Sequence, residues 1–132
     1  MDKELSALVR TELAELNYLF DQVAGYMQLF AQPTRLRIMH RLCDRECSVN
    51  EVVEAIGATQ TNVSRHLSVM HKARVLARRK EGTTVYYTVS DPKAVELCRS
   101  VCMHMITSMC ELTVSQNTAS NFMGTFMGTH ND

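Results

Sequence analysis

The sequence predicts a mainly α-helical domain that carries one small β-hairpin. Apolar residues recur at helical spacing over most of residues 5–112, and the period changes to two only over residues 75–89. Capping residues divide the helical part into separate segments. With 132 residues, 45% of them hydrophobic, the chain has enough apolar material for a single core. We therefore expect one domain over residues 1–113 and a flexible tail rich in Ser, Thr, Asn and Gly over residues 114–132.

The first two helices are expected on either side of residues 31–32. Apolar spacing predicts a long amphipathic helix from Leu5 to Phe30. Pro33 suits the first turn of a second helix, because its missing N–H needs no partner there. This second helix should end near Cys43 and Asp44. Its buried face should be formed by Leu36, Ile38, Met39 and Leu42.

Two short helices should follow, joined by a tight turn. Ser48 and Glu51 have the spacing of a capping box, which starts the third helix. Gly57 suits a left-handed C-terminal cap, and Thr59 can cap the fourth helix two residues later. The inward positions of the fourth helix should be Val63, Leu67 and Met70. Two short helices around a glycine turn are typical of a helix-turn-helix.

A hairpin and a last helix complete the expected fold. Residues 75–79 and 84–89 are rich in β-formers, and residues 80–83 between them have the composition of a turn. Asp91 and Pro92 then provide a cap and a first helical residue for a helix that should extend to about Leu112. A hairpin directly after the second helix of a helix-turn-helix is a wing, so the sequence predicts a winged helix-turn-helix.

The zero net charge of the chain hides a strong local bias. Residues 59–80 contain six Lys and Arg side chains and no Asp or Glu. A basic segment in an otherwise neutral domain is typical of a nucleic-acid interface. The alternative is an ordinary solvated surface that happens to be basic. The capped fourth helix, its polar outer face and the basic hairpin behind it together favour double-stranded DNA as the partner.

The second helix of a helix-turn-helix enters the major groove, so its outward side chains should meet base edges. These are Gln60, Thr61, Asn62, Ser64 and Arg65. His66 and Ser68 are further candidates, as contacts to phosphates. The hairpin should add phosphate or minor-groove contacts from Arg78, Arg79 and Lys80.

Three segments resemble those of ArsR/SmtB repressors: residues 31–38 (AQPTRLRI), 64–67 (SRHL) and 80–87 (KEGTTVYY). The resemblance covers about residues 26–105. It implies an obligate homodimer in which the first and last helices of both subunits pack together. One departure is Arg74, at a link where the family usually has glycine because the backbone is left-handed. We expect either a reshaped turn there or strain of about 1 kcal/mol.

The resemblance also implies a repressor that leaves DNA when an inducer reaches its cysteines. The candidate cysteines here are Cys43, Cys47, Cys98, Cys102 and Cys110, and His104 is a further candidate. Cys98 and Cys102 are four residues apart, so they share one helix face. Thiols can be oxidised or persulfidated, or they can capture arsenite, Cd or Zn. Equally, all five could be buried small side chains without a sensing role, because cysteine is among the most buried residue types.

Other functions are less consistent with the sequence. It contains no phosphate-binding glycine loop, no zinc-hydrolase His-Glu motif and no identifiable nucleophile-base pair, so we do not expect an enzyme. The remaining alternatives are a winged helix that binds proteins and a constitutive DNA binder without a sensor. The first residues lack the layout of a signal peptide and there is no long apolar run, so we expect a cytoplasmic protein without a membrane partner.

Overall fold

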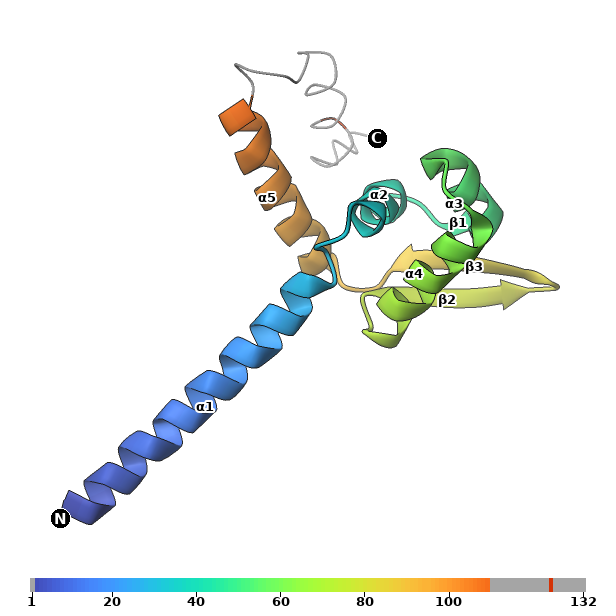
Figure 1. The fold of residues 1–132 in the computed structure, drawn as a ribbon. Coiled ribbons are helices and arrows are strands. Elements are labelled where there is room, and N and C mark those ends of the chain that lie inside the picture. Colours follow the sequence, from blue (N-terminus) through green and yellow to red (C-terminus); the bar gives the residue numbers. More distant parts are fainter. Residues whose placement is uncertain (1, 110–123, 125–132) are drawn as a thin grey trace. The chain divides into compact units, whose positions relative to one another are not determined.

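The computed structural model describes residues 2–109 and residue 124, and it confirms a winged helix-turn-helix (Figure 1). Cys110 and the predicted tail, residues 114–132, lie outside the described residues except for residue 124. The elements in chain order are α1 (Asp2–Gln28), α2 (Pro33–Leu42), β1 (Cys47–Ser48), α3 (Val49–Ile56), α4 (Gln60–Lys72), β2 (Leu76–Glu81), β3 (Thr84–Val89) and α5 (Pro92–Met109). The chain divides into two compact units, with the boundary between Gln32 and Pro33. None of the helices within residues 2–109 has the length and apolar character needed to cross a bilayer.

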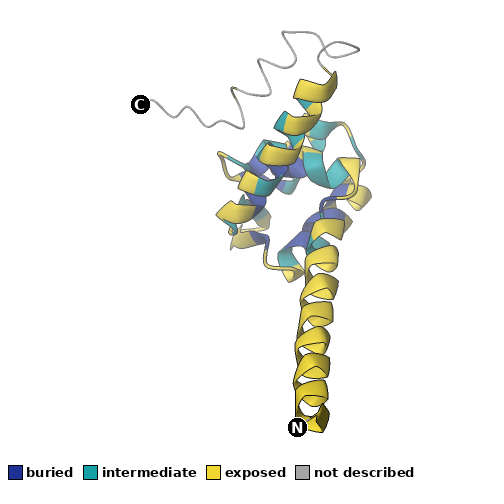
Figure 2. Cartoon of the chain, turned by 90° about the vertical axis from the view of Figure 1, so that its left-hand side faces the viewer, coloured by how far each residue is buried: buried dark blue, intermediate teal, exposed yellow. Residues whose placement is uncertain are grey.

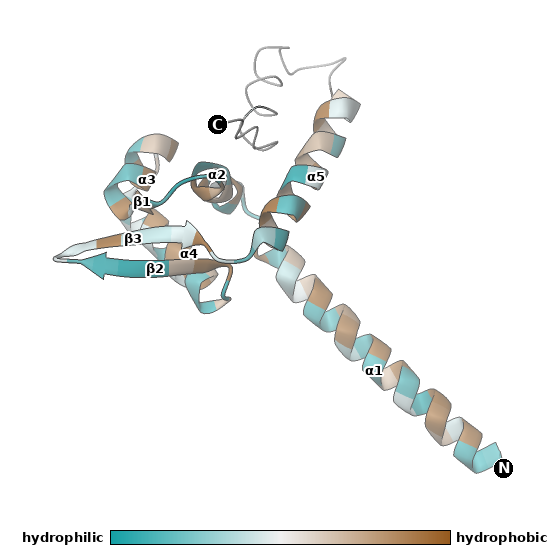
Figure 3. Cartoon of the chain, turned by 180° about the vertical axis from the view of Figure 1, so that it is seen from behind, coloured by the Kyte–Doolittle hydropathy of each residue, from teal (hydrophilic) through white to brown (hydrophobic). Residues whose placement is uncertain are grey.

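The helix α1 is one long amphipathic helix that buries none of its side chains (Figure 2). It begins at Asp2, three residues before the expected start, and ends at Gln28. Hydrophobic residues recur along its length in Figure 3. Among them, Leu5 is 63% exposed and Leu13 is 54% exposed. A helix gains most of its stability from packing an apolar face, and the apolar side chains of α1 are exposed.

The core lies in the second unit, among α2, α3, α4 and the sheet (Figure 2). The predicted inner positions of α4, Val63, Leu67 and Met70, are all fully buried. From α2 the core takes Ile38, Met39 and Leu42. Other fully or nearly fully buried side chains are Cys47, Val52, Val75 and Leu76. This packing fixes the rotation of α4 and therefore decides which of its side chains face outward.

The predicted caps of α3 and α4 are confirmed. The backbone N–H of Glu51 donates to Ser48 Oγ at 3.2 Å, and the N–H of Ser48 donates to the Glu51 carboxylate at 3.3 Å. Gly57 ends α3 with a φ of 70°, in the left-handed region that favours glycine. Thr59 Oγ1 then accepts from the N–H of Asn62 at 3.2 Å. These bonds set the turn of the helix-turn-helix.

The sheet has three strands in the order β1-β3-β2, one more than the sequence predicts. The extra strand, β1, has only two residues and pairs antiparallel with β3, Cys47 opposite Tyr87 and Ser48 opposite Tyr86. The pairing ties the residues before α3 to the base of the wing. The hairpin β2-β3 pairs in register from Leu76 opposite Val89 to Glu81 opposite Thr84.

The link from α4 to β2 keeps its left-handed conformation although it lacks glycine. Arg74 has a φ of 65°, so the turn is strained and not reshaped. The Arg74 carbonyl accepts a hydrogen bond from Ser90 Oγ at 2.9 Å, and the Arg74 N–H donates to the carbonyl of His71 at 2.9 Å. The strain at Arg74 is thus offset by local hydrogen bonds.

Candidate nucleic-acid interface

The outward side of α4 carries the side chains expected to read DNA. Gln60, Thr61, Asn62, Ser64 and Arg65 are all exposed. The helix contains no acidic residue, so no carboxylate on it would repel a phosphate. Amide and guanidinium groups are the donors and acceptors that pair with adenine and guanine edges. In this unbound state, Arg65 Nη2 donates to Asn62 Oδ1 at 3.3 Å, which holds two candidate base contacts side by side.

His66 does not belong to this outward surface, contrary to the sequence-based expectation. Its side chain is buried, with 6% of the residue exposed, and its Nδ1 accepts a hydrogen bond from Arg35 Nε at 3.1 Å. Burial, with smaller contributions from Arg35 and Arg65, lowers the pKa of His66. Because Nδ1 acts as an acceptor, the ring is neutral in this arrangement. His66 therefore connects α4 to α2. Ser68 is half-buried on the same helix.

On the wing, Arg78 and Lys80 lie on the side of the sheet that faces α4. Neighbouring side chains of a strand point to opposite faces, so Arg78 and Lys80 share the face of buried Leu76. Arg78 lies opposite Tyr87, whose ring contacts the ring of His71 on α4 at a centroid distance of 6.4 Å. Both cations are exposed. They extend the positive surface of α4 along the wing.

Arg79 points to the other face of the sheet and is already engaged. Its guanidinium donates to the Glu46 carboxylate at 2.6 and 2.8 Å and to Glu81 at 2.8 Å, and it lies 4.5 Å above the Tyr86 ring. These hydrogen bonds raise the pKa of Arg79 and lower that of Glu46. Its expected role as a DNA contact does not fit this geometry. Arg79 instead holds the wing to the segment before α3.

A polar hollow of about 330 Å³ lies between the start of α3, the outer side of α4 and the wing turn. It is lined by Ser48, Val49, Asn50, Gln60, Ser64, Thr83, Thr84 and Val85. Hydroxyl and amide groups of this kind commonly contact phosphates and set the register of a protein on DNA. Asn50, Thr83 and Thr84 were missed in the sequence. The sequence pattern that could have identified them is the presence of polar residues in the first turn of α3 and at the tip of the hairpin.

The candidate sensor cysteines lie in three different places. Cys47 is fully buried in β1, and Cys43 is half-buried after α2, with its thiol donating to the His40 carbonyl at 3.1 Å. On α5, Cys98 is buried and Cys102 is half-buried. Burial raises the pKa of Cys43 and Cys102, and it raises that of Cys98 to about 11, with a smaller contribution from Cys102.

Within residues 2–109, no three His, Cys, Asp or Glu side chains come together closely enough to hold a metal ion. Cys98 and Cys102 supply at most two sulfurs from one helix turn. Structural zinc sites normally have four ligands, so a complete zinc site would need donors from elsewhere.

Comparison with known proteins places these features in a family. The model of "Bacterial regulatory protein, arsR family" matches residues 32–77. The chain is 36% identical over 80 residues to the HTH-type transcriptional regulator KmtR of Mycobacterium tuberculosis. This alignment covers 58% of this chain and 62% of KmtR. It is 32% identical over 80 residues to the HTH-type regulator Rv0081 of the same organism, covering 60% of this chain and 70% of Rv0081. The chain thus spans less than two thirds of KmtR.

Solved structures have the same fold. The crystal structure of Rv0081 aligns with a TM-score of 0.62 and 27% identity, covering 70% of this chain and 94% of that one. NolR from Sinorhizobium fredii aligns with a TM-score of 0.63 and 25% identity, covering 66% of this chain and 87% of that one. KmtR and Rv0081 are both named as HTH-type transcriptional regulators, in agreement with the helix-turn-helix and wing of this chain.

Proposed function

Because this chain belongs to the ArsR family of bacterial regulatory proteins, we propose that it is a repressor that binds operator DNA as a homodimer and leaves it when an inducer reaches its cysteines. The family consists of transcriptional regulators and not of enzymes. The proposal has three parts: sequence-specific DNA binding, dimerisation and cysteine sensing. Each is supported by a different observation.

DNA binding is supported by one observation above all. The exposed polar side of α4 and the cations Arg78 and Lys80 of the wing lie on the same side of the sheet. The helix supplies base-reading groups, and the wing supplies charge that would neutralise phosphates. The hollow between them offers neutral donors for the intervening backbone. Arg65, exposed on α4, carries the guanidinium that would pair with a guanine.

Dimerisation is supported by an exposed apolar face on each of two helices, α1 and α5. On α1 the face includes Leu5 and Leu13, which are 63% and 54% exposed, and on α5 it includes Val101 and Met105, which are 53% and 47% exposed. Exposed apolar surface this extensive usually marks an interface. We assign it to a second copy of the chain, because a two-fold dimer presents two equal recognition helices to a palindromic operator.

Cysteine sensing is supported by the position of Cys98 and Cys102. They lie on α5 within one helix turn of Val101 and Met105, so a modification that shifts α5 would also shift the proposed dimer contact. A change in that contact alters the spacing of the two recognition helices. Release needs a coupling free energy of a few kcal/mol, typically about 1–3 kcal/mol.

Two inducer chemistries remain open for these thiols. Peroxide would take two electrons and two protons from a pair of thiols, giving a disulfide and two waters, and a polysulfide would leave a persulfide or a sulfur bridge. Arsenite, Cd or Zn would instead displace the thiol protons and bind the sulfurs. In the second case, the missing ligand would come from Cys110 or from the partner subunit.

The proposal is tested by titrating the reduced protein into fluorescent duplexes selected from a randomised pool, at low salt and without inducer. We expect tight binding that is weakened by Arg65→Ala and kept by Lys93→Ala, an exposed cation on α5. The titration is then repeated with arsenite, Cd, Zn, peroxide and polysulfide. Failure to bind any duplex would overturn the proposal in favour of a protein-binding winged helix.

A second set of titrations assigns the sensor. If Cys102→Ser no longer responds to an inducer that releases the parent protein, Cys102 is part of the sensor. If binding persists with every compound, the protein is a constitutive DNA binder. The control is Cys47→Ser, because Cys47 is fully buried in β1 and should not affect the response.

A further inference from the structure

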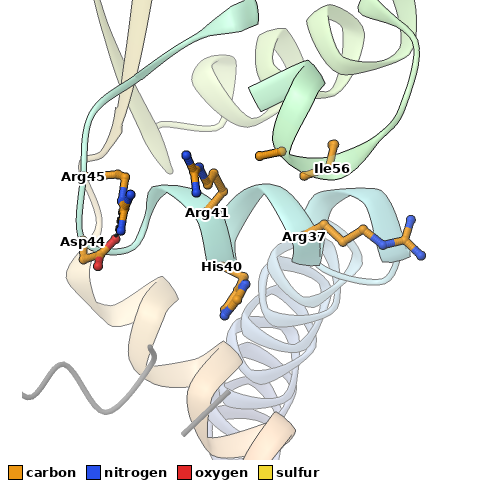
Figure 4. A pocket seen from close by; sticks show the side chains of 7 residues that line it. Arg37, His40, Arg41, Asp44, Arg45 and Ile56 are labelled. Carbon is orange, nitrogen blue, oxygen red and sulfur yellow. Dashed lines mark hydrogen bonds and ion pairs between the residues drawn. The ribbon is translucent and has the colours of Figure 1, made fainter. Parts of the chain in front are cut away.

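A second pocket lies between α2 and the end of α3, away from the DNA interface and the cysteines. Figure 4 shows its side chains: Arg37, His40 and Arg41 come from α2, Asp44 and Arg45 from the loop that follows, and Ile56 from α3. The volume of the cavity is about 450 Å³, within the range of sites for small molecules. None of its lining residues belongs to the hollow beside α4.

The lining carries an excess of positive charge. Arg37, Arg41 and Arg45 contribute three guanidinium groups, against one carboxylate, that of Asp44. The Arg45 Nε donates to Asp44 Oδ1 at 3.3 Å, so one cation is balanced. Within residues 2–109, neither of the other two arginines forms an ion pair, which leaves a charge of about +2 in the pocket.

His40 adds little to this charge. Burial lowers its pKa, Asp44 opposes that effect, and the neighbouring Arg41 lowers it further. The ring is therefore mostly neutral at pH 7, and the positive charge of the pocket resides on the guanidinium groups.

The strongest evidence for a ligand in this pocket comes from Arg41. Its Nε is buried and, among the residues that the structure describes, has no hydrogen-bond partner. A buried guanidinium N–H normally has an acceptor, from the protein, from water or from a bound molecule. Guanidinium groups match the oxygen geometry of phosphates and carboxylates.

The opposite wall is apolar. Ala55 and Ile56, the last residues of α3, supply methyl and methylene groups and no polar side-chain atom. A ligand that fills the cavity would therefore combine anionic oxygens with a short hydrocarbon part. We propose that this pocket binds a small organic dianion, which carries either a phosphate or two carboxylates on a short apolar body.

The phosphate backbone of DNA is a less suitable occupant. The polar hollow lies at the first turn of α3, and this pocket lies at its last turn. Eight helical residues separate the two ends by about 12 Å. A ligand at the last turn would join α2 to the residue before Gly57, the turn that leads into α4. An effect of the ligand on DNA affinity rests on the proposed function, whereas its binding does not.

The binding itself is tested by calorimetry on the full chain in phosphate-free buffer at fixed ionic strength. The probes are phenyl phosphate, succinate, inorganic phosphate and phenol. We expect phenyl phosphate or succinate to bind at one site per chain, at least about tenfold tighter than inorganic phosphate, and phenol not to bind. Whichever binds more tightly identifies the anionic group. If neither binds, or if phenol binds equally well, the proposal is wrong.

Variants locate the site. Arg41→Gln and Arg37→Gln should each weaken binding of the better probe about tenfold or more, because each removes a charge-assisted hydrogen bond from an arginine without an ion pair. Arg37 is exposed, so its replacement should leave folding intact, as a melting curve will verify. Arg10→Gln on α1 is the matched control and should bind like the parent. If Arg78→Gln removes the binding while Arg41→Gln retains it, the anion sits on the wing and the pocket is not the site.

Discussion

Arg78 and Arg79 are neighbours in β2 with the same charge, yet they should contribute very differently to DNA binding. Arg78 is exposed on the face of the sheet that α4 shares, whereas Arg79 is held on the other face by Glu46 and Glu81. If each Arg78 of a dimer neutralises one phosphate, Arg78→Ala removes two phosphate contacts. Each contact contributes about −0.9 to the slope of log K against log salt, so the slope should become shallower by about 1.8.

This change has a measurable size. Between 50 and 200 mM salt, a slope difference of about 1.8 corresponds to roughly a twelvefold smaller loss of affinity. Fluorescence anisotropy with one selected duplex at four salt concentrations would measure the slope for the parent, Arg78→Ala and Arg79→Ala. We expect Arg79→Ala to retain the slope of the parent, because its charge is already compensated. Equal slopes for the two variants would refute the assignment of faces, and an unchanged slope for Arg78→Ala would remove the wing from the interface.

Three further predictions concern stability. Arg74→Gly should raise the free energy of unfolding by up to about 1 kcal/mol, measured by urea denaturation, because glycine adopts the φ of 65° without strain. Ser48→Ala should lower it by about 1 kcal/mol in the same assay, because the cap of α3 loses its acceptor. The lowered pKa of His66 means that the unfolded chain takes up a proton first, so stability should fall as pH drops below 6.5 towards the folded pKa. Melting curves should show a smaller fall for His66→Gln.

The helix-turn-helix could be predicted because its signals are local. Ser48, Glu51, Gly57 and Thr59 act within one helix turn of their partners, so their spacing in the sequence already contains the geometry. The strand β1 could not be predicted in this way. It has two residues, and it exists only because Tyr86 and Tyr87 of a distant strand pair with it. Such a short strand has no periodicity of its own.

The two misplaced side chains have different origins. His66 lies three residues after Val63 and four before Met70, a spacing that places it at the edge of the buried face of α4. The sequence therefore contained this signal, and the polar character of histidine masked it. For Arg79 the sequence contained less information about its position, because its partner Glu46 is 33 residues away. The face of the sheet on which Arg79 lies also depends on the register of the hairpin. Only the three-dimensional pairing of β1, β2 and β3 brings these two residues together.

The environment of the thiols also limits how an inducer can act. With its pKa raised to about 11, Cys98 is almost entirely a protonated thiol at pH 7. The thiolate is the form that attacks an oxidant, so oxidation of the resting protein should begin at a less buried thiol, of which half-buried Cys102 is the example on α5. Capture of a metal or metalloid displaces the thiol proton in the binding step itself, so its affinity should rise with pH. The pH dependence of release from DNA therefore separates the two chemistries: a rate that follows the ionisation of one thiol indicates oxidation, and an equilibrium that shifts with pH indicates capture.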